Sequence, residues 1–219
     1  MAFDKKDITV LYRKRAKNYN LSANLYYLID IREYAYRKRA ADALALNSGD
    51  VVVEVGCGTG LNFGPLRNKV GPEGKIVGLD LTFDMLSVAK QRIEDKGWKN
   101  ISLIQCDAAS YDFSLHLDGI ISTFAITLMP EYDQIIKKGS AALSPGKKLV
   151  VLDFKMPAKW PIWLIKLFVI LTRPFGVTLD LADRHPWESI GRYLDSLKVE
   201  TFYCDAIYIA AGEKGRTVR

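Results

Sequence analysis

Three glycines at alternate positions, Gly56, Gly58 and Gly60, follow a run of valines. That run, Val51–Val55, holds four β-branched residues and one acid, Glu54, and is typical of a strand buried on both faces. Glycine lets the backbone turn sharply and approach a ligand closely. In open α/β sheets such a turn lies at the carboxyl ends of the strands, where ligands bind. We therefore expect a nucleotide-type cofactor site here.

The spacing of the glycines separates two classes of cofactor. A dinucleotide site needs the pattern G-x-G-x-x-G. Its third glycine falls on Leu61 when the pattern starts at Gly56, and on Phe63 when it starts at Gly58. The sequence instead has E-x-G-x-G-x-G, starting at Glu54, which argues against a dinucleotide. A loop that only turns a strand into a helix is the alternative interpretation.

A second acid, Asp80, ends a short apolar segment and lies 20 residues after Gly60. An acid at this distance, after the second strand of such a fold, binds the ribose hydroxyls of a nucleotide. A carboxylate accepts both hydroxyl protons and so holds the ribose in one orientation. Residues 82–86 have the pattern of a helix start, so Asp80 could instead cap that helix. After the glycine loop, we favour the binding role.

Five further segments have the composition of strands. They are residues 101–107, 117–124, 143–154, 199–204 and 206–210. Residues 101–107 end in a third acid, Asp107. Residues 143–154 begin with the pattern of a helix end and a turn. The last two are joined at Asp205 and predict an antiparallel pair.

In this order and spacing, residues 50–154 resemble the core of the class I S-adenosylmethionine (SAM) dependent methyltransferases. The glycine loop is similar to their motif I and residues 117–124 to their motif IV. The resemblance implies an α/β, Rossmann-like fold, with a mostly parallel seven-stranded sheet and an antiparallel C-terminal pair. It implies SAM as the cofactor, with the acid after the third strand on the adenine amino group. The cofactor-binding residues it implies are Tyr19, Glu54, Gly56, Cys57, Gly58, Gly60, Asp80, Leu81, Met85, Asp107, Ala108 and Ser122.

The composition suits one globular domain, because 219 residues with 26% charged and 49% hydrophobic side chains can bury a substantial core. We expect a single methyltransferase domain in four parts. These are an N-terminal helical cap (1–46), the SAM-binding core (47–154), an apolar membrane or substrate insertion (155–185), and the last helix with the closing strand pair (186–219).

The cysteines and the N-terminus predict the compartment. Cys57, Cys106 and Cys204 have no metal-binding spacing, and their odd number favours reduced thiols. The N-terminal residues have no apolar signal-peptide core. We therefore expect a cytoplasmic protein without a metal site.

Positive charge is concentrated near the N-terminus. Residues 1–49 hold ten Lys or Arg and five acids, which gives +5 of the total net charge of +6. A solvated helix face is one interpretation of each of these charges. As a cluster they favour an anionic partner: phosphate headgroups, a membrane surface or nucleic acid.

The segment from Trp160 to Leu171 favours a membrane among these partners. It is apolar except for Lys166, but it is too short for a bilayer core that needs about 20 apolar residues. Lys159, Lys166 and Arg173 are seven residues apart and would line one stripe of a helix. This pattern predicts a helix lying in the headgroup region of an anionic membrane, through residues 159–173. A helix in the core or at a dimer interface is the alternative.

Two families of methyltransferases that act on membrane amphiphiles have similar motifs: the bacterial phosphatidylethanolamine N-methyltransferases and the ubiquinone/menaquinone C-methyltransferases. Residues 12–19 are similar to their N-terminal motif Y-x-x-x-A-x-x-Y-D, although Asn20 replaces its acid. Residues 184–188 are similar to their R-x-P-W-E segment. The resemblance implies a protein attached peripherally to the membrane, with a lipid substrate.

Candidate reaction residues come from these motifs. We expect Tyr19 and His185 to be catalytic, although His185, before Pro186, could equally cap a helix. The expected substrate-binding residues are Tyr12, Arg13, Arg184 and Trp187. An arginine would hold a lipid phosphate, and aromatic rings would attract an ammonium product.

The main functional hypothesis is N-methylation of a phospholipid amine such as phosphatidylethanolamine. A quinone C-methyltransferase is the alternative, and it would need a base for a phenolic proton and no phosphate clamp. Methylation of RNA or of a small molecule is less favoured. The chain has no N/D-P-P-Y-type motif and its insertion is apolar, so we expect no nucleic acid partner. A module that binds SAM without catalysis is the remaining alternative.

Overall fold

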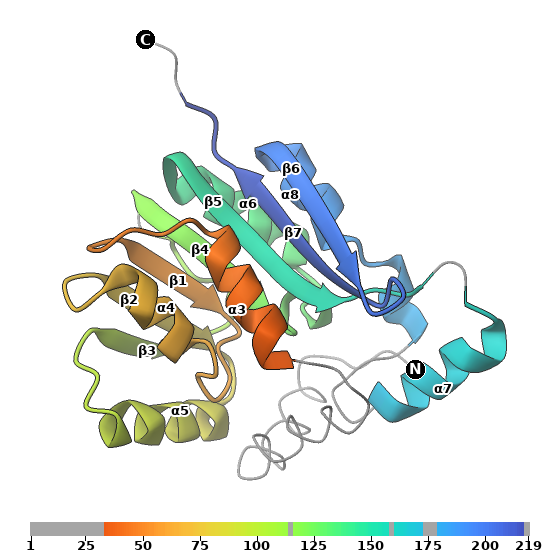
Figure 1. Ribbon diagram of the computed structural model, residues 1–219, viewed down its shortest axis with the longest axis horizontal. Coiled ribbons are helices and arrows are strands. Elements are labelled where there is room, and N and C mark those ends of the chain that lie inside the picture. The colour runs from red at the N-terminus through yellow and green to blue at the C-terminus, as the bar shows by residue number, and fades with distance from the viewer. Residues whose placement is uncertain (1–32, 114–115, 158–159, 173–178, 217–219) are drawn as a thin grey trace.

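The described strands form a single seven-stranded sheet in the order β3-β2-β1-β4-β5-β7-β6 (Figure 1). This computed structural model describes residues 33–113, 116–157, 160–172 and 179–216. The strands are β1 (Val51–Val55), β2 (Lys75–Asp80), β3 (Ile101–Gln105), β4 (Leu117–Thr123), β5 (Leu143–Phe154), β6 (Asp195–Phe202) and β7 (Ile207–Glu213). The first five run parallel, and β7 pairs antiparallel with β5 and β6. The predicted fold class is confirmed.

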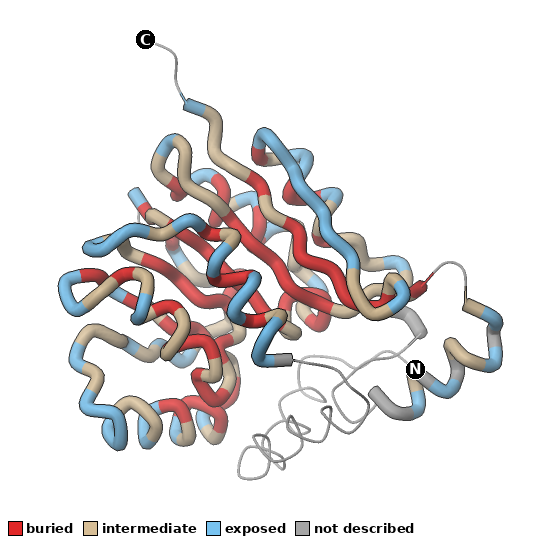
Figure 2. The backbone as a smooth tube through the Cα atoms, in the orientation of Figure 1, coloured by how far each residue is buried: buried red, intermediate tan, exposed pale blue. Residues whose placement is uncertain are grey.

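Helices cover both faces of the sheet. One layer contains α3 (Glu33–Ala43), α4 (Phe63–Val70) and α5 (Phe83–Asp95), and the other contains α6 (Tyr132–Ala142) and α8 (Pro186–Tyr193). Side chains alternate between the faces of a strand. Val52 and Ile121 therefore pack under the first layer, whereas Val53 and Ile120 pack under the second. Figure 2 shows the resulting core, with buried central strands between exposed helix surfaces.

Three further elements lie near the carboxyl ends of the parallel strands. They are η3 (Ile126–Leu128), η5 (Leu179–Asp183) and α7 (Ile162–Thr172). The helix predicted over the apolar insertion is therefore present as α7, which projects beyond the ends of β5 and β7 (Figure 1). Among the described helices, none is both long and apolar enough to span a bilayer.

Two predicted boundaries were wrong. Residues 143–146 belong to β5 rather than to a turn, because Gly146 at φ +78° carries the chain through an irregularity while its N–H donates to the Lys214 carbonyl. The closing strands are also longer than predicted and are joined by residues 203–206. Val199 is 42% exposed because β6 is the edge strand, so its pattern is not that of a buried strand.

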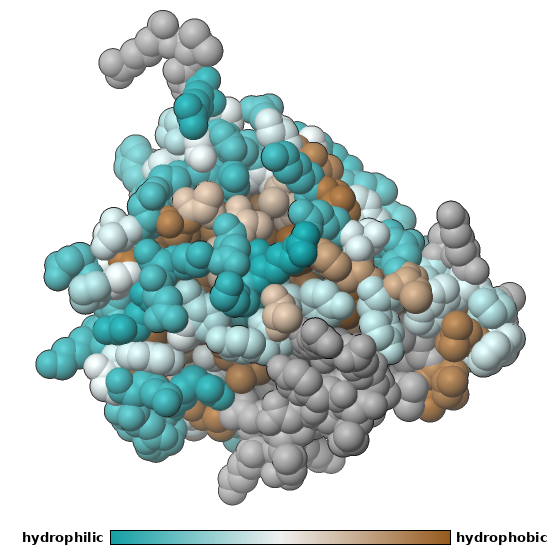
Figure 3. All heavy atoms as spheres, viewed as in Figure 1, coloured by the Kyte–Doolittle hydropathy of each residue, from teal (hydrophilic) through white to brown (hydrophobic). Residues whose placement is uncertain are grey.

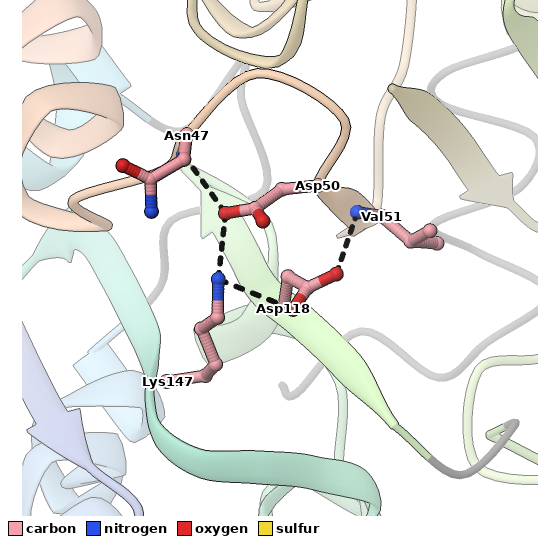
Figure 4. Close-up of polar contacts among 5 residues, drawn as sticks. All are labelled: Asn47, Asp50, Val51, Asp118 and Lys147. Atoms are coloured by element: carbon pink, nitrogen blue, oxygen red, sulfur yellow. Dashed lines mark hydrogen bonds and ion pairs between the residues drawn. The ribbon is translucent and has the colours of Figure 1, made fainter. Parts of the chain in front are cut away.

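A polar cluster joins the amino ends of the central strands, opposite the ligand-binding edge. Lys147 Nζ lies 2.8 Å from Asp50 Oδ2 and 3.1 Å from Asp118 Oδ1 (Figure 4). The same carboxylates accept backbone N–H groups from Asn47 and Val51. Burial alone would lower the pKa of Lys147, but its hydrogen bonds to the two carboxylates outweigh this and raise the pKa. This ammonium group thus ties β5 to the starts of β1 and β4.

We predict that Lys147→Met lowers the free energy of unfolding by about 1.5 to 3 kcal/mol, because two partly buried carboxylates lose their shared cation. Lys148→Met is the matched control, since Lys148 makes a single pair with Glu213 at 3.9 Å. Lys148→Met should lower the free energy of unfolding by less than about 1 kcal/mol. Urea unfolding of both variants measures the difference. Equal losses of unfolding free energy in the two variants would contradict a special stabilising role of the polar cluster.

Candidate active site

A pocket opens at the carboxyl ends of four parallel strands. Its wall comes from the segments that follow them: residues 56–59 after β1, 80–82 after β2, 106–108 after β3, and 123–125 at the end of β4. The strand order places these segments side by side, in the order β3, β2, β1, β4. This is the edge at which open α/β sheets bind ligands.

The glycine loop leaves free space for a ligand in this pocket. Gly58 has φ +53°, and a Cβ built there would meet no atom within 4 Å, so the backbone is bare toward the pocket. Gly60 has φ +74° and lies where a Cβ would collide with the ring of Phe63. The two glycines therefore have different uses: the first leaves space for a ligand, and the second permits packing of α4 against the loop.

The carboxylate of Asp80 links the glycine loop to β2. Its Oδ2 accepts the Gly58 N–H at 2.8 Å, and its Oδ1 accepts the Thr82 N–H at 2.8 Å. Burial raises the pKa of Asp80, opposed by these hydrogen bonds. Each oxygen has a further lone pair, so the carboxylate can accept hydroxyl groups in a fixed orientation. Asp80 is not the N-cap residue of α5, as the alternative interpretation required, because Thr82 occupies that position.

The third predicted acid lies at the other end of the pocket. Asp107 Oδ1 accepts the Ala109 N–H at 3.0 Å, which fixes the turn after β3. Asp107 and Ala108 line the pocket, as do Leu81 and Met85. Cys57 also lines it, and burial raises the pKa of its thiol well above the ordinary value, which makes it a poor nucleophile.

Glu54, Gly60 and Ser122 lie behind the pocket wall rather than on it. Glu54 is 1% exposed, and its Oε1 accepts a hydrogen bond from Asn62 Nδ2 at 2.5 Å. Burial raises its pKa to about 8. Ser122 Oγ donates to the Val55 carbonyl at 2.8 Å and so joins β4 to β1. These residues support the wall, and their predicted direct contacts with a cofactor stay predictions.

A buried cation that no sequence motif predicts lies at the β4 end of the pocket. Arg37, on α3, is 6% exposed and lines the pocket. Its Nη1 donates to Thr123 Oγ1 and, at 3.4 Å, to Asn62 Oδ1. Its guanidinium carbon lies 5.2 Å from the ring centroid of Phe124. No motif marks this residue, because its partners are 25 and 86 positions away in the sequence.

The wall beyond Arg37 is apolar. It consists of Phe124, Ala125, Leu128, Met129 and Pro130. Phe124 has φ +53°, a conformation that costs a non-glycine residue about 1 to 3 kcal/mol and that often occurs at functional sites. It turns the chain out of β4 and over the pocket.

The η3 turn is held from behind by two charged residues. Asp153 Oδ2 accepts the Thr127 N–H at 3.1 Å, and Arg184 Nη1 donates to the Thr127 carbonyl at 2.8 Å. Burial raises the pKa of Asp153 to about 6, against the lowering effect of its backbone hydrogen bonds. Arg184, predicted to bind substrate, therefore contacts the back of the wall.

The other predicted reaction residues are not on the described pocket wall. His185 is the N-cap residue of α8, with Pro186 as the first helical position. Its Nε2 lies 3.1 Å from the Ala182 carbonyl and its Nδ1 lies 3.1 Å from Glu188 Oε1. Trp187 packs edge-on against buried Tyr208, with ring centroids 4.9 Å apart. His185 thus occupies the N-cap position without a side-chain hydrogen bond to the helix backbone, and its predicted catalytic role stays a prediction.

Tyr12, Arg13 and Tyr19 lie outside the described residues, as do Lys159 and Arg173. Their predicted roles stay predictions.

The chain is similar to known proteins in sequence and in fold. Residues 46–167 match the family model described as a methyltransferase domain. A demethylmenaquinone methyltransferase from Bacillus cytotoxicus is 29% identical over 127 residues, which is 58% of this chain and 54% of that protein. The chain thus spans about half the length of the curated relatives it matches.

Solved structures share the fold. Phosphoethanolamine N-methyltransferase 2 from Haemonchus contortus, in complex with S-adenosyl-L-methionine, has a TM-score of 0.61 at 17% identity, over 78% of this chain and 50% of that one. A SAM-dependent methyltransferase from Aquifex aeolicus has a TM-score of 0.56 at 16% identity, over 80% and 88% of the two chains. The family match, the strand order and the glycine loop with its following acids agree, and the chain belongs to the class I SAM-dependent methyltransferases.

Proposed function

We propose that this methyltransferase transfers a methyl group to a ring carbon of a membrane quinol, of the demethylmenaquinone type. The observation that carries the proposal is the apolar wall of Phe124, Ala125, Leu128, Met129 and Pro130 next to the glycine loop. A flat, apolar ring fits such a wall better than a charged headgroup does. The demethylmenaquinone methyltransferases at about 30% identity support the same substrate class.

The phospholipid hypothesis has less support from the site. It needs a cation to hold the phosphate. Of the two arginines that we expected there, Arg13 lies outside the described residues and Arg184 donates instead to the Thr127 carbonyl behind the wall. Of the described residues that line the pocket, Arg37 is the only Lys or Arg. The quinone alternative requires no phosphate clamp, so it accounts better for this lining.

The described residues fit the cofactor of the family. The space above Gly58 admits a ligand against bare backbone, and Asp80 presents a fixed carboxylate beside it for the ribose hydroxyls. Asp107 and Ala108 would hold the adenine, at the β3 end. When bound, SAM supplies a methyl group activated by the adjacent sulfonium.

The protein's part in the reaction is alignment and exclusion of water. A quinol ring carbon becomes nucleophilic as its hydroxyl proton leaves, and the site must hold this carbon in line with the sulfur–methyl bond that would break. The methylated ring carbon would then lose its hydrogen as a proton, which restores the aromatic ring. The apolar side chains of the wall would keep water from this point. Tyr19 stays our predicted catalytic residue.

We also propose that α7 attaches the protein to an anionic membrane surface, from which a lipid substrate is taken. Trp163, Leu167 and Ile170 are 67%, 44% and 66% exposed. At spacings of four and three residues they share one face of α7. Figure 3 shows hydrophobic residues gathered on this projecting helix. The net charge of +6 would add attraction to anionic headgroups.

For the cofactor site, we predict that Gly58→Val abolishes SAM binding, because its side chain would occupy the open space above the loop. Asp80→Ala should weaken binding by about 1.5 to 3 kcal/mol, the scale of hydrogen bonds to a charged group. Calorimetry measures both affinities. Asp95→Ala, on the outer end of α5, is the control and should bind as the wild type does. Unchanged affinity in Gly58→Val would remove the site assignment.

For the substrate, we predict that labelled SAM transfers its methyl group to a short-chain demethylmenaquinol and not to phosphatidylethanolamine in the same vesicles. The oxidised quinone should not react, because its ring carbon is electron-poor. Separation of the labelled lipids measures the outcome. Label in phosphatidylethanolamine, or equal reaction of quinone and quinol, would contradict the proposal.

For the membrane surface, we predict that the double variant Trp163→Ser and Ile170→Ser lowers binding to anionic vesicles at least about tenfold, because two exposed apolar side chains no longer insert. SAM affinity should be unchanged. The matched control replaces Leu197 and Val199 of β6, which are 38% and 42% exposed, with Ser. Vesicle sedimentation compares the two. Equal losses in both variants, or none in either, would argue against α7 as the attachment site.

A further inference from the structure

The order of the strand ends decides how the cofactor must lie in the pocket. From one end to the other, the wall presents Asp107 after β3, Asp80 after β2, Gly58 after β1 and Thr123 at the end of β4. The two acids mark the positions of the adenine and the ribose. The methionine part of the cofactor must then extend past the glycine loop, toward β4.

Arg37 lies at this β4 end. It reaches the pocket from α3, and its Nη1 donates both to Thr123 Oγ1 and to Asn62 Oδ1. Asn62 is itself fixed, because its Nδ2 donates to Glu54 at 2.5 Å and to Thr123 at 2.8 Å. The guanidinium group is therefore held by two buried side chains, Thr123 and Asn62, and by the face of Phe124. A cation fixed in this way is a preorganised partner for an anion.

The surrounding charges also favour an anion. Glu54 lies behind Arg37, and because burial raises its pKa to about 8, its carboxyl group is largely protonated at neutral pH. A second guanidinium group is close, since Arg92 Nε donates to the Thr59 carbonyl of the loop at 2.9 Å. Burial first, and then the charge of Arg37, lower the pKa of Arg92. Arg37 is thus the arginine that lines the pocket where the methionine part must lie, and Arg92 adds positive charge beside the glycine loop without lining the pocket.

We propose that Arg37 binds the α-carboxylate of the cofactor's methionine moiety, and that it makes the site selective for ligands that carry this carboxylate. The residue acts in cofactor binding and takes no part in the transfer of the methyl group. Because α3 precedes the glycine loop in the chain, this contact also makes cofactor binding depend on the docking of α3 on the sheet.

The test compares ligands that differ only at the methionine end. S-adenosylhomocysteine has the carboxylate, its decarboxylated analogue lacks it, and 5′-methylthioadenosine lacks the whole amino-acid part. We expect the wild type to bind S-adenosylhomocysteine at least about tenfold more tightly than the decarboxylated analogue, the scale of a charge-assisted hydrogen bond. Equal affinities in the wild type would overturn the proposal without any variant.

Variants then assign the effect to one residue. Arg37→Gln should weaken S-adenosylhomocysteine at least about tenfold while changing 5′-methylthioadenosine less than about twofold. Arg39→Gln is the matched control: it lies on the same helix, pairs with Glu200 at the surface, and should leave both affinities unchanged. If Arg37→Gln does not fold, Arg37→Lys, which keeps the charge, should still bind the carboxylate ligand better than its decarboxylated analogue.

Two results would contradict the assignment. Equal weakening of both ligands by Arg37→Gln would mean that the residue only maintains the pocket. Unchanged S-adenosylhomocysteine affinity, with a change only in the Michaelis constant of the methyl acceptor, would mean that Arg37 binds an anionic substrate instead.

Discussion

One pair of hydrogen bonds connects the parts of this site. The carboxylate of Asp80 accepts the N–H of Gly58 with one oxygen and the N–H of Thr82 with the other. The glycine loop after β1 is thereby fixed to the end of β2 and to the start of α5. Parallel pairing of β1 with β2 and β4 brings the remaining strand ends to the same edge. A nucleotide site follows from this constraint, because hydrogen-bond donors, hydrogen-bond acceptors and the Gly58 backbone, which carries no side chain, lie along the same edge of the sheet.

The two ends of the pocket differ in chemistry, and this difference supports the division between cofactor and substrate. Acids line the β2 and β3 end, an arginine lies at the β4 end, and apolar residues continue the wall through η3. Asp153 and Arg184 hold η3 from behind through the backbone of Thr127. Hydrogen bonds thus position the apolar wall as well as the polar one, which suits a reaction that depends mainly on alignment.

The sequence was sufficient for the fold and for the half of the site formed by local motifs. The valine run forms β1 and the glycines follow it, Asp80 ends β2, and Asp107 lies just after β3, so their spacing predicts their place on the sheet edge. Arg37 could not be predicted, because it reaches the pocket only through the packing of α3. His185 and Arg184 were ambiguous for a similar reason: a motif shows which residues occur together, but not whether they face the pocket or the back of its wall. The limits of β5 and β6 depended on an irregular pairing and on an edge position, which strand composition does not reveal.

A crystal structure of the complex with S-adenosylhomocysteine tests the account of the site most directly. The account predicts ribose hydroxyls within hydrogen-bond distance of the Asp80 carboxylate, adenine beside Asp107 and Ala108, and the ligand carboxylate at Arg37. The reverse orientation, with the amino-acid part at the β3 end, or a ribose that does not contact Asp80, would contradict it.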